Sequence, residues 1–217
     1  MKALTEKIME TDLVNRVFND LQLGRKLGGS SSRRYGLVNR ALKAGELHRV
    51  KRGLYVLDNK YRDYPLHPFA LAQALAPGSY VSLETALAHH GWIPEGVYTI
   101  ASIVPGRKSK EYEHEKLGSF TFHPLASNKG YFLELVERLK INGQSMMVAK
   151  PVRALMDLVC LRKTEWQGMD WLTEGLRIDY DYLRSITHAD IRTLRLVYKQ
   201  KRVKTFLDNL ARKLGND

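Results

Sequence analysis

Apolar residues recur at helical spacing between residues 30 and 45 of this chain. They would share one face of a short helix, formed by Leu37, Val38, Ala41 and Leu42. The serines at 30–32 can cap its first turn, and Gly45 stands where a left-handed residue ends many helices. The pattern therefore predicts an amphipathic helix that ends at Gly45.

After this helix the pattern changes to that of a hairpin. Residues 47–51 and 54–56 flank Arg52-Gly53, and the glycine permits a tight reversal between two strands. A helix followed by such a hairpin is typical of a winged helix. Upstream, apolar positions at 4–23 recur at near-helical steps up to Gly24, which predicts the helices that pack beneath the first one.

The segment 59–64 is polar and aromatic and is followed by Pro65, so it is interpreted as a short linker. The prediction is a winged-helix domain at 1–58 and a second domain at 65–217. The second domain mixes helical and strand periods. Helices are predicted at 68–75 and 83–90, with Ser82 as the cap of the latter, and strands at 97–104 and 119–123.

Further along, Asn142-Gly143 between two apolar runs is the strongest hairpin signal in the chain. Pro151 starts a helix that reaches about Arg162. A capping box at Thr187 then begins one long helix or a broken pair that ends at Gly215. The predicted fold class is α+β: an N-terminal winged helix-turn-helix, then a mixed α/β domain that ends in a basic helix.

The distribution of charged residues indicates a function for this fold. The chain carries a formal net charge of +12, and the segment from Arg25 to Arg52 holds nine Arg and Lys but a single acid, Glu46. Phosphates are the expected counter-charge. The predicted DNA-binding residues on the helix face are Arg33, Arg34, Tyr35, Asn39, Arg40 and Lys43, and those on the wing are Arg49, Lys51 and Arg52.

Basic clusters elsewhere are candidates for additional phosphate contacts. These are Arg107, Lys108, Lys110, Lys199, Lys201, Arg202 and Lys204. The alternative interpretation of every basic run is a solvated face, and winged helices also serve as protein-docking modules. The loop bounded by Gly106 and Gly118 is expected to be polar and exposed.

Catalytic and metal-binding chemistry is sparse. The histidines lack the spacing of two metal ligands on one helix face, and phosphate-binding and dinucleotide-binding motifs are missing, so no metal, cofactor or catalytic residue is predicted. Cys160 lies in an apolar run and is expected to be a buried thiol. The acidic start and the lack of a long apolar stretch predict a cytoplasmic protein without a membrane segment.

Three segments together resemble the AbiEi-type antitoxin family. The first is 45–55, similar to that family's helix end and wing; the second is 80–91, a serine-led, alanine-rich helix that ends in His90-Gly91. The third is 148–158, a strand, a proline and a helix with a Leu-x-Asp-Leu pattern that contains Asp157. The glycine- and serine-rich stretch 24–32 departs from the family, because it replaces a clear first helix of the helix-turn-helix.

The resemblance implies an antitoxin of a type IV toxin–antitoxin operon. Such a protein represses its own promoter by binding double-stranded DNA, and it counters a nucleotidyltransferase-like toxin without forming a stable complex. The residues carried over are the basic wing and helix positions. Ser82, His90 and Asp157 match the C-terminal pattern and are interpreted as a helix cap, a helix end and a buried, hydrogen-bonded carboxylate.

Two alternatives stay open. One is a winged-helix transcription factor whose second domain senses a small ligand. The other is a metal-dependent nuclease that uses the carboxylates of Glu111, Glu113 and Glu115, since such enzymes hold a divalent ion between acidic side chains.

Overall fold

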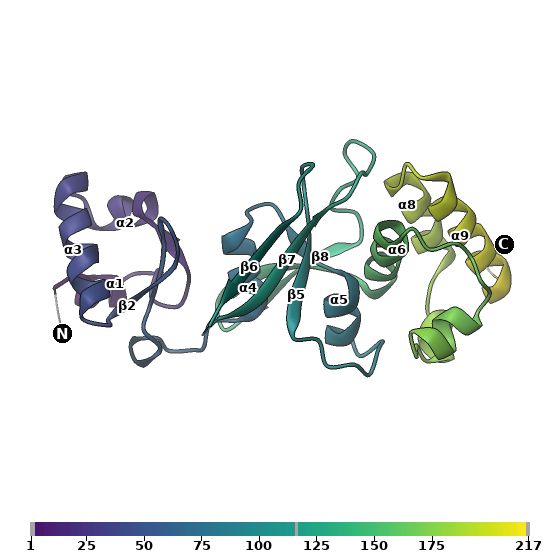
Figure 1. Cartoon of the computed structure of the whole chain (residues 1–217), viewed down its shortest axis with the longest axis horizontal. Helices are drawn as coiled ribbons and strands as arrows, with labels where there is room; N and C mark the ends of the chain where they lie inside the picture. Colours follow the sequence, from purple (N-terminus) through teal and green to yellow (C-terminus); the bar gives the residue numbers. More distant parts are fainter. Residues whose placement is uncertain (1–2, 116, 216–217) are drawn as a thin grey trace. The chain divides into compact units, whose positions relative to one another are not determined.

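The structure of the chain, a computed structural model, describes residues 3–115 and 117–215. Its fold is mixed α+β, as the sequence pattern predicts (Figure 1). Contacts divide the chain into two compact units. The first comprises Met1–Pro77, His114–Leu117 and Lys140–Met146; the second comprises Gly78–Glu113, Gly118–Leu139 and Met147–Asp217. The boundaries proposed from the sequence, at 58 and 65, stay a prediction.

Three helices and a small sheet build the N-terminal part of the first unit. The helices are α1 (Ala3–Met9), α2 (Asp20–Leu27) and α3 (Ser31–Lys43). The antiparallel sheet has the order β1-β3-β2, with β1 at Phe18–Asn19, β2 at Leu47–Lys51 and β3 at Leu54–Leu57. A core of fully buried apolar side chains joins them: Leu4, Ile8, Leu13, Phe18, Leu23, Val38, Ala41, Leu47 and Leu57.

The predicted helix and hairpin are confirmed. Ser30 caps α3 by accepting a hydrogen bond from the Arg33 amide, and Gly45 follows the helix with a φ of 67°. Gly53 turns the hairpin with a φ of 78°, which the missing side chain permits.

The region before α3 corrects two predictions. The helices predicted within 4–23 are present as α1 and α2, separated by a turn and by β1, but the predicted helix end at Gly24 is wrong. Asn19 starts α2 with a capping box, and the helix continues through Gly24 to Leu27. A clear helix therefore occupies part of the glycine- and serine-rich stretch 24–32, where the sequence predicts none.

The segment at 59–77 contains a short 3₁₀ helix, η1 (Asn59–Tyr61), and α4 (Pro68–Leu75). The predicted linker thus has structure of its own: Asp58 caps η1, and Asn15 and Asp63 exchange hydrogen bonds. Helix α4 is confirmed at its predicted bounds, with Pro68 in its first turn.

The longer sheet has the order β6-β7-β5-β4-β9-β8. Its strands are β4 (Tyr80–Val81), β5 (Thr99–Val104), β6 (Lys110–His114), β7 (Gly118–Pro124), β8 (Val136–Ile141) and β9 (Gln144–Ala149). Strands β5 and β7 run parallel, as do β4 and β9, whereas β4 and β5 are antiparallel. The predicted turn at Asn142-Gly143 is confirmed, since both residues have positive φ.

Strand β6 corrects the expectation of an irregular loop between Gly106 and Gly118. Lys110, Glu111 and Glu113 of β6 are exposed, and the strand lies at the edge of the sheet. Charged side chains are common on edge strands, because they prevent pairing with other chains. The charge-rich sequence of this segment is therefore compatible with an edge strand as well as with a loop.

Helices make up the rest of the second unit. These are α5 (Leu83–His89), α6 (Pro151–Arg162), a π-helical turn η2 (Trp171–Gly175), α7 (Tyr180–Arg184), α8 (His188–Val197) and α9 (Lys201–Leu214). Helix α6 has its predicted bounds, and the C-terminal segment is the broken pair rather than one long helix. The buried Cys160 thiol is confirmed, and burial raises its pKa to about 11.

Candidate nucleic-acid interface

The exposed face of α3 is basic and polar. Val38 and Ala41 are buried in the core, so the opposite side of the helix faces outward. Tyr35 is 68% exposed. The other predicted contacts on this helix that are exposed or partly exposed are Arg33, Asn39, Arg40 and Lys43.

Strand β2 packs against α3 and extends the basic surface. Arg49 and Arg52 are exposed, on the strand and on the turn that follows it. The single acid of this segment, Glu46, is only 7% exposed, and its carboxylate accepts a 2.6 Å hydrogen bond from the Thr5 hydroxyl. The carboxylate of Glu46 thus points inward, whereas Arg49 and Arg52 face outward.

Arg34 differs from the other predicted contacts, because its side chain is only 16% exposed. Its guanidinium donates hydrogen bonds to the carbonyls of Gly28 and Gly29, at 3.3 and 2.5 Å, and lies 3.7 Å from a carboxylate oxygen of Asp20. A Cβ added at Gly24 would come within 3.0 Å of the Arg34 guanidinium carbon. Arg34 thus holds the turn between α2 and α3.

Two further predicted contacts are also engaged inside the protein. The Lys51 ammonium donates a hydrogen bond to the Leu75 carbonyl at 2.5 Å. Arg202 donates to the Cys160 carbonyl at 3.4 Å. Neither interaction could be foreseen from the sequence, because each depends on a partner at least 24 residues away.

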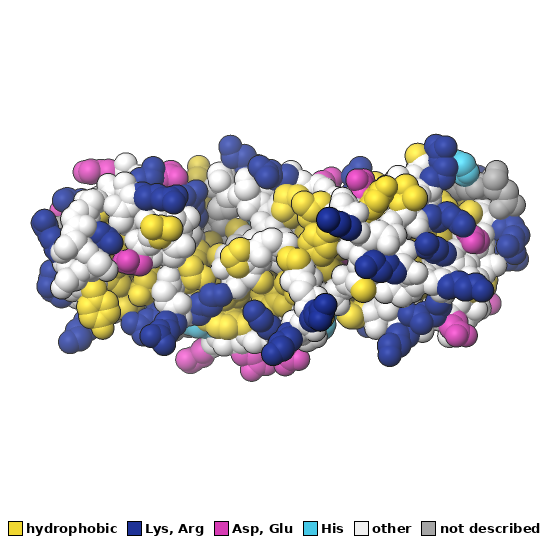
Figure 2. Space-filling model, turned by 90° about the horizontal axis from the view of Figure 1, so that it is seen from above, with side chains coloured by type: hydrophobic (Ala, Val, Ile, Leu, Met, Phe, Trp, Pro, Cys, Tyr) yellow, Lys and Arg dark blue, Asp and Glu magenta, His cyan; other side chains and the backbone are white. Residues whose placement is uncertain are grey.

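The remaining candidate phosphate contacts belong to the second unit. Arg107 and Lys108 lie on the loop before β6, and Lys110 starts that strand; all three are exposed. Lys199 and Lys201 are exposed at the junction of α8 and α9, and Lys204 is half-buried on α9. On the face drawn in Figure 2, basic side chains are spread widely, while acidic ones form a few small groups.

The buried carboxylate of the third resembling segment is the centre of a polar network. Asp157 accepts hydrogen bonds from Arg153 at 2.9 Å, Tyr80 at 2.9 Å, Ser82 at 2.8 Å and Tyr198 at 2.7 Å. All five side chains are fully buried. The interpretation of Asp157 is confirmed, and His90 ends α5 as expected. Ser82 stands at the N-cap position of α5, but its hydroxyl bonds Asp157 and makes no capping hydrogen bond, which corrects its predicted role.

Alkaline pH is expected to destabilise the second unit through this network. Burial raises the pKa of Tyr80 and of Tyr198 well above its usual value, and the Asp157 carboxylate adds to the shift. The unfolded chain releases these protons near pH 10, whereas the folded chain retains them. Stability is therefore complete below about pH 10 and falls above it, by up to about 2.7 kcal/mol per pH unit for two groups.

Urea denaturation at several values of pH measures this effect. All three tryptophans, Trp92, Trp166 and Trp171, belong to the second unit, so their fluorescence reports its unfolding. The variant with both tyrosines replaced by phenylalanine should show a flatter profile above pH 10. A wild-type profile that stays level through this range would contradict the expectation.

The nuclease alternative gains no support from the arrangement of its carboxylates. Glu111 and Glu113 are exposed on edge strand β6, and Glu115 is exposed beyond its end. Within residues 3–115 and 117–215, no group of three or more His, Cys, Asp or Glu side chains could hold a metal ion.

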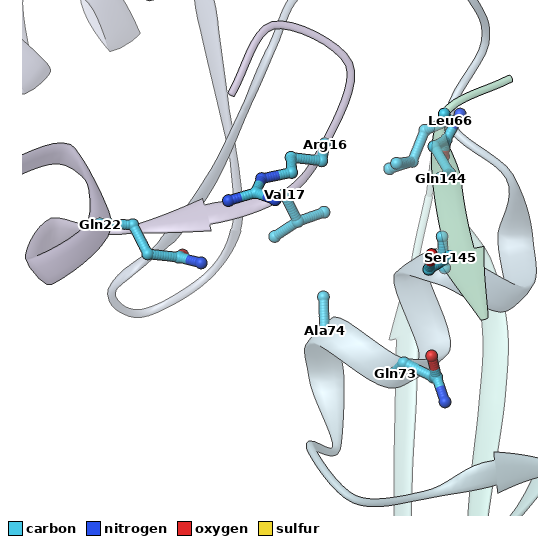
Figure 3. Close-up of a pocket in the computed structure, with 10 residues that line it drawn as sticks. Arg16, Val17, Gln22, Leu66, Gln73, Ala74, Gln144 and Ser145 are labelled. Carbon is cyan, nitrogen blue, oxygen red and sulfur yellow. The ribbon is translucent and has the colours of Figure 1, made fainter. Parts of the chain in front are cut away.

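Two pockets offer little to a ligand. One, of about 310 Å³, lies in the first unit and is lined by Arg16, Gln73 and Gln144 among others (Figure 3). The Gln144 amide is already bonded to the His67 amide and the Pro65 carbonyl. The other, of about 340 Å³, lies in the second unit. Glu84 and Arg162 line it, and these two side chains form an ion pair with each other.

No family model matches this chain, and no curated protein does. The fold is similar to the crystal structure of the RV2827C protein from Mycobacterium tuberculosis, with a TM-score of 0.55. The sequence identity is 14%, over 97% of this chain and 78% of the other. At this identity the likeness shows the fold alone. No helix in the described part of the chain is both long and apolar enough to cross a membrane.

Proposed function

We propose that the protein binds double-stranded DNA through its first unit, which acts as a winged helix. In this proposal α2 and α3 form the helix-turn-helix, and the β2–β3 hairpin is the wing. The observation that carries the proposal is the sorting of charge: Arg33, Lys43, Arg49 and Arg52 are exposed, while Glu46 is buried. Such a basic surface is the electrostatic signature of nucleic-acid binding.

Residues on α3 would read bases, and residues on the wing would contact phosphates. Arg33, Asn39 and Arg40 carry the donors and acceptors that form paired hydrogen bonds with guanine or adenine edges. Arg49 and Arg52 supply charge to the backbone or the minor groove. Arg34 and Lys51 act as positioning residues, because their side chains fix the α2–α3 turn and the wing from inside.

Gly36 supports a partner that approaches α3 closely. Glycine inside a helix costs about 0.5–1 kcal/mol relative to alanine. A Cβ at this position would meet only the Arg40 guanidinium, at an ordinary 3.6 Å, so internal packing does not require glycine. On the helix, positions 36, 40 and 43 share the outward face. A flat surface there suits the floor of a major groove.

Gly36→Ala is therefore expected to stabilise the first unit by about 0.5–1 kcal/mol while it weakens DNA binding. Thermal unfolding followed by circular dichroism and DNA titration by fluorescence anisotropy measure the two effects. Gly96→Ala in the second unit is the control, since a Cβ there meets nothing and its φ is ordinary. A stabilised Gly36→Ala variant with unchanged affinity would show that this face does not meet DNA.

We further propose that the protein is the antitoxin of a type IV toxin–antitoxin operon and represses its own promoter. The support is the resemblance of 45–55, 80–91 and 148–158 to AbiEi-type antitoxins. The second unit would counter a nucleotidyltransferase-like toxin without a stable complex, and no catalytic residue or cofactor is assigned to it.

Co-expression with the product of the neighbouring gene tests the antitoxin proposal. Wild-type protein should restore growth, and a variant with Arg33→Ala and Lys43→Ala should also restore it, because these changes affect only DNA binding. If the well-expressed wild-type protein fails to restore growth, the antitoxin proposal is wrong. The proposal that the protein binds DNA would not be affected by that result.

A further inference from the structure

A third pocket, of about 310 Å³, lies beside the hairpin in the first unit. It is lined by His48, Arg49, Val56, Asp58, Asn59 and Arg62, and by His114 and Leu117. Two guanidinium groups and two imidazoles thus face a single carboxylate. The pocket is cationic, although the segment around Arg62 is only a linker in the sequence interpretation.

The carboxylate in this pocket is already satisfied. The imidazole Nε2 of His48 lies 2.6 Å from the Asp58 carboxylate, whose other oxygen accepts a hydrogen bond from the Lys60 amide. The hydrogen bond with His48 lowers the pKa of Asp58. Asp58 is therefore ionised at neutral pH. Its charge also acts on Arg62, where it raises the pKa against the larger effect of burial, so one carboxylate stands against two arginines.

Arg62 has donors that the protein does not use. Its Nη2 donates to the Asn59 side-chain oxygen at 3.1 Å. Its Nε and Nη1 are buried and find no acceptor among the described residues. Buried donors without a partner are costly and are rare in folded proteins, and burial lowers the pKa of Arg62. Because both nitrogens lie below the surface, an anion in the pocket would reach them only after a small rotation of the Arg62 side chain, and its oxygens would then supply the missing acceptors.

We propose that this pocket binds a phosphate ester, with Arg62 and Arg49 as its cationic partners. Guanidinium groups bind phosphate strongly, because they combine charge with several fixed donors. The volume is at the lower end of the range of small-molecule sites, about 300–1,000 Å³, and is enough for a phosphate group with a small organic moiety. Val56 and Leu117 provide apolar walls for the rest of the molecule.

The phosphate can belong to a free small molecule or to the DNA backbone. Arg49 is also a proposed wing contact, so a free phosphate ester would compete with DNA for it. That regulatory consequence rests on the proposed function, whereas binding of the phosphate ester does not.

Full-length protein is titrated with AMP, with adenosine as the uncharged comparison, and thermal unfolding is recorded. AMP at about a hundredfold above its Kd should raise the melting temperature by roughly 5–10 °C. Arg62→Gln should abolish the rise. Arg138→Gln, a matched change at an exposed position of the second unit, should retain it. If Arg62→Gln does not fold, Arg49→Gln replaces it, because Arg49 is exposed; this variant should also lose the rise in melting temperature with AMP.

A second titration uses a DNA duplex. If AMP does not bind but Arg62→Gln lowers DNA affinity about tenfold and reduces the salt slope by about one, the phosphate comes from DNA and the proposal stands. Equal stabilisation by AMP and adenosine would overturn it, as would the absence of both the AMP and the DNA effects. Arg62-dependent AMP binding by a protein that binds no DNA would support the pocket and refute the proposed function.

Discussion

Asp157→Ala is expected to lower the free energy of unfolding of the second unit by about 3–5 kcal/mol. The carboxylate accepts hydrogen bonds from four buried side chains, among them the Arg153 guanidinium. Its removal leaves a buried positive charge without a counter-charge and three hydroxyl groups without this acceptor. Native proteins are stable by only about 5–15 kcal/mol, so the change removes a large fraction of the total.

Tryptophan fluorescence in urea measures this loss, because every tryptophan belongs to the second unit. Glu84→Gln is the matched control: it breaks the ion pair with Arg162, whose side chain is 53% exposed, and should cost less than about 1 kcal/mol. Asp157→Ala with a stability close to that of Glu84→Gln would show that the network does not hold this unit together.

The double variant Arg153→Met/Asp157→Ala separates the ion pair from the rest of the network. If the cost of Asp157→Ala comes mainly from the unpaired guanidinium, the double variant should be less destabilised than the sum of the two single variants, by about 1–3 kcal/mol. If the effects of the two single variants simply add, the destabilisation by Asp157→Ala comes from the lost hydrogen bonds of the hydroxyl groups instead.

The combined variant Arg33→Ala/Lys43→Ala is expected to lower specific DNA affinity about a hundredfold. Each side chain is exposed on α3, and loss of one base or phosphate contact costs about 1–3 kcal/mol. Two losses of about 1.4 kcal/mol each, toward the lower end of this range, correspond to a factor of about one hundred, since each 1.4 kcal/mol is tenfold. Neither side chain contributes to the core of the first unit, so folding should be unaffected.

Anisotropy titrations with the duplex measure this affinity, and circular dichroism checks the fold. Lys129→Ala/Arg138→Ala removes the same charge from exposed positions of the second unit and controls for a general effect of net charge. Equal losses in the two variants would mean that overall charge, and not α3, determines binding. Arg34→Ala is a poor substitute for Arg33→Ala, because it would also release the α2–α3 turn.

Local signals made much of the fold predictable. The Ser30 cap, Gly53, Asn142-Gly143 and Pro151 each determine a turn or a helix start through backbone preferences that need no distant partner. The same holds for the capping box at Thr187, which begins α8.

Predictions that depended on distant partners were less successful. The Ser82 hydroxyl bonds Asp157, 75 residues away, instead of capping its own helix. Arg34 follows the helical period of a surface residue, yet the carbonyls of the Gly28-Gly29 turn draw its guanidinium inward. The sequence does not indicate strand β6, because an edge strand tolerates charge that is also typical of a loop.

The DNA-binding proposal is tested most directly by fluorescence anisotropy of the wild-type protein on its own upstream DNA and on a scrambled duplex, titrated with salt. Binding to the upstream DNA is expected to be tighter than binding to the scrambled duplex by about a thousandfold or more. Equal affinity for both duplexes, with the same steep dependence on salt, would contradict sequence-specific binding by α3 and reduce the net charge of +12 to a nonspecific attraction for phosphate.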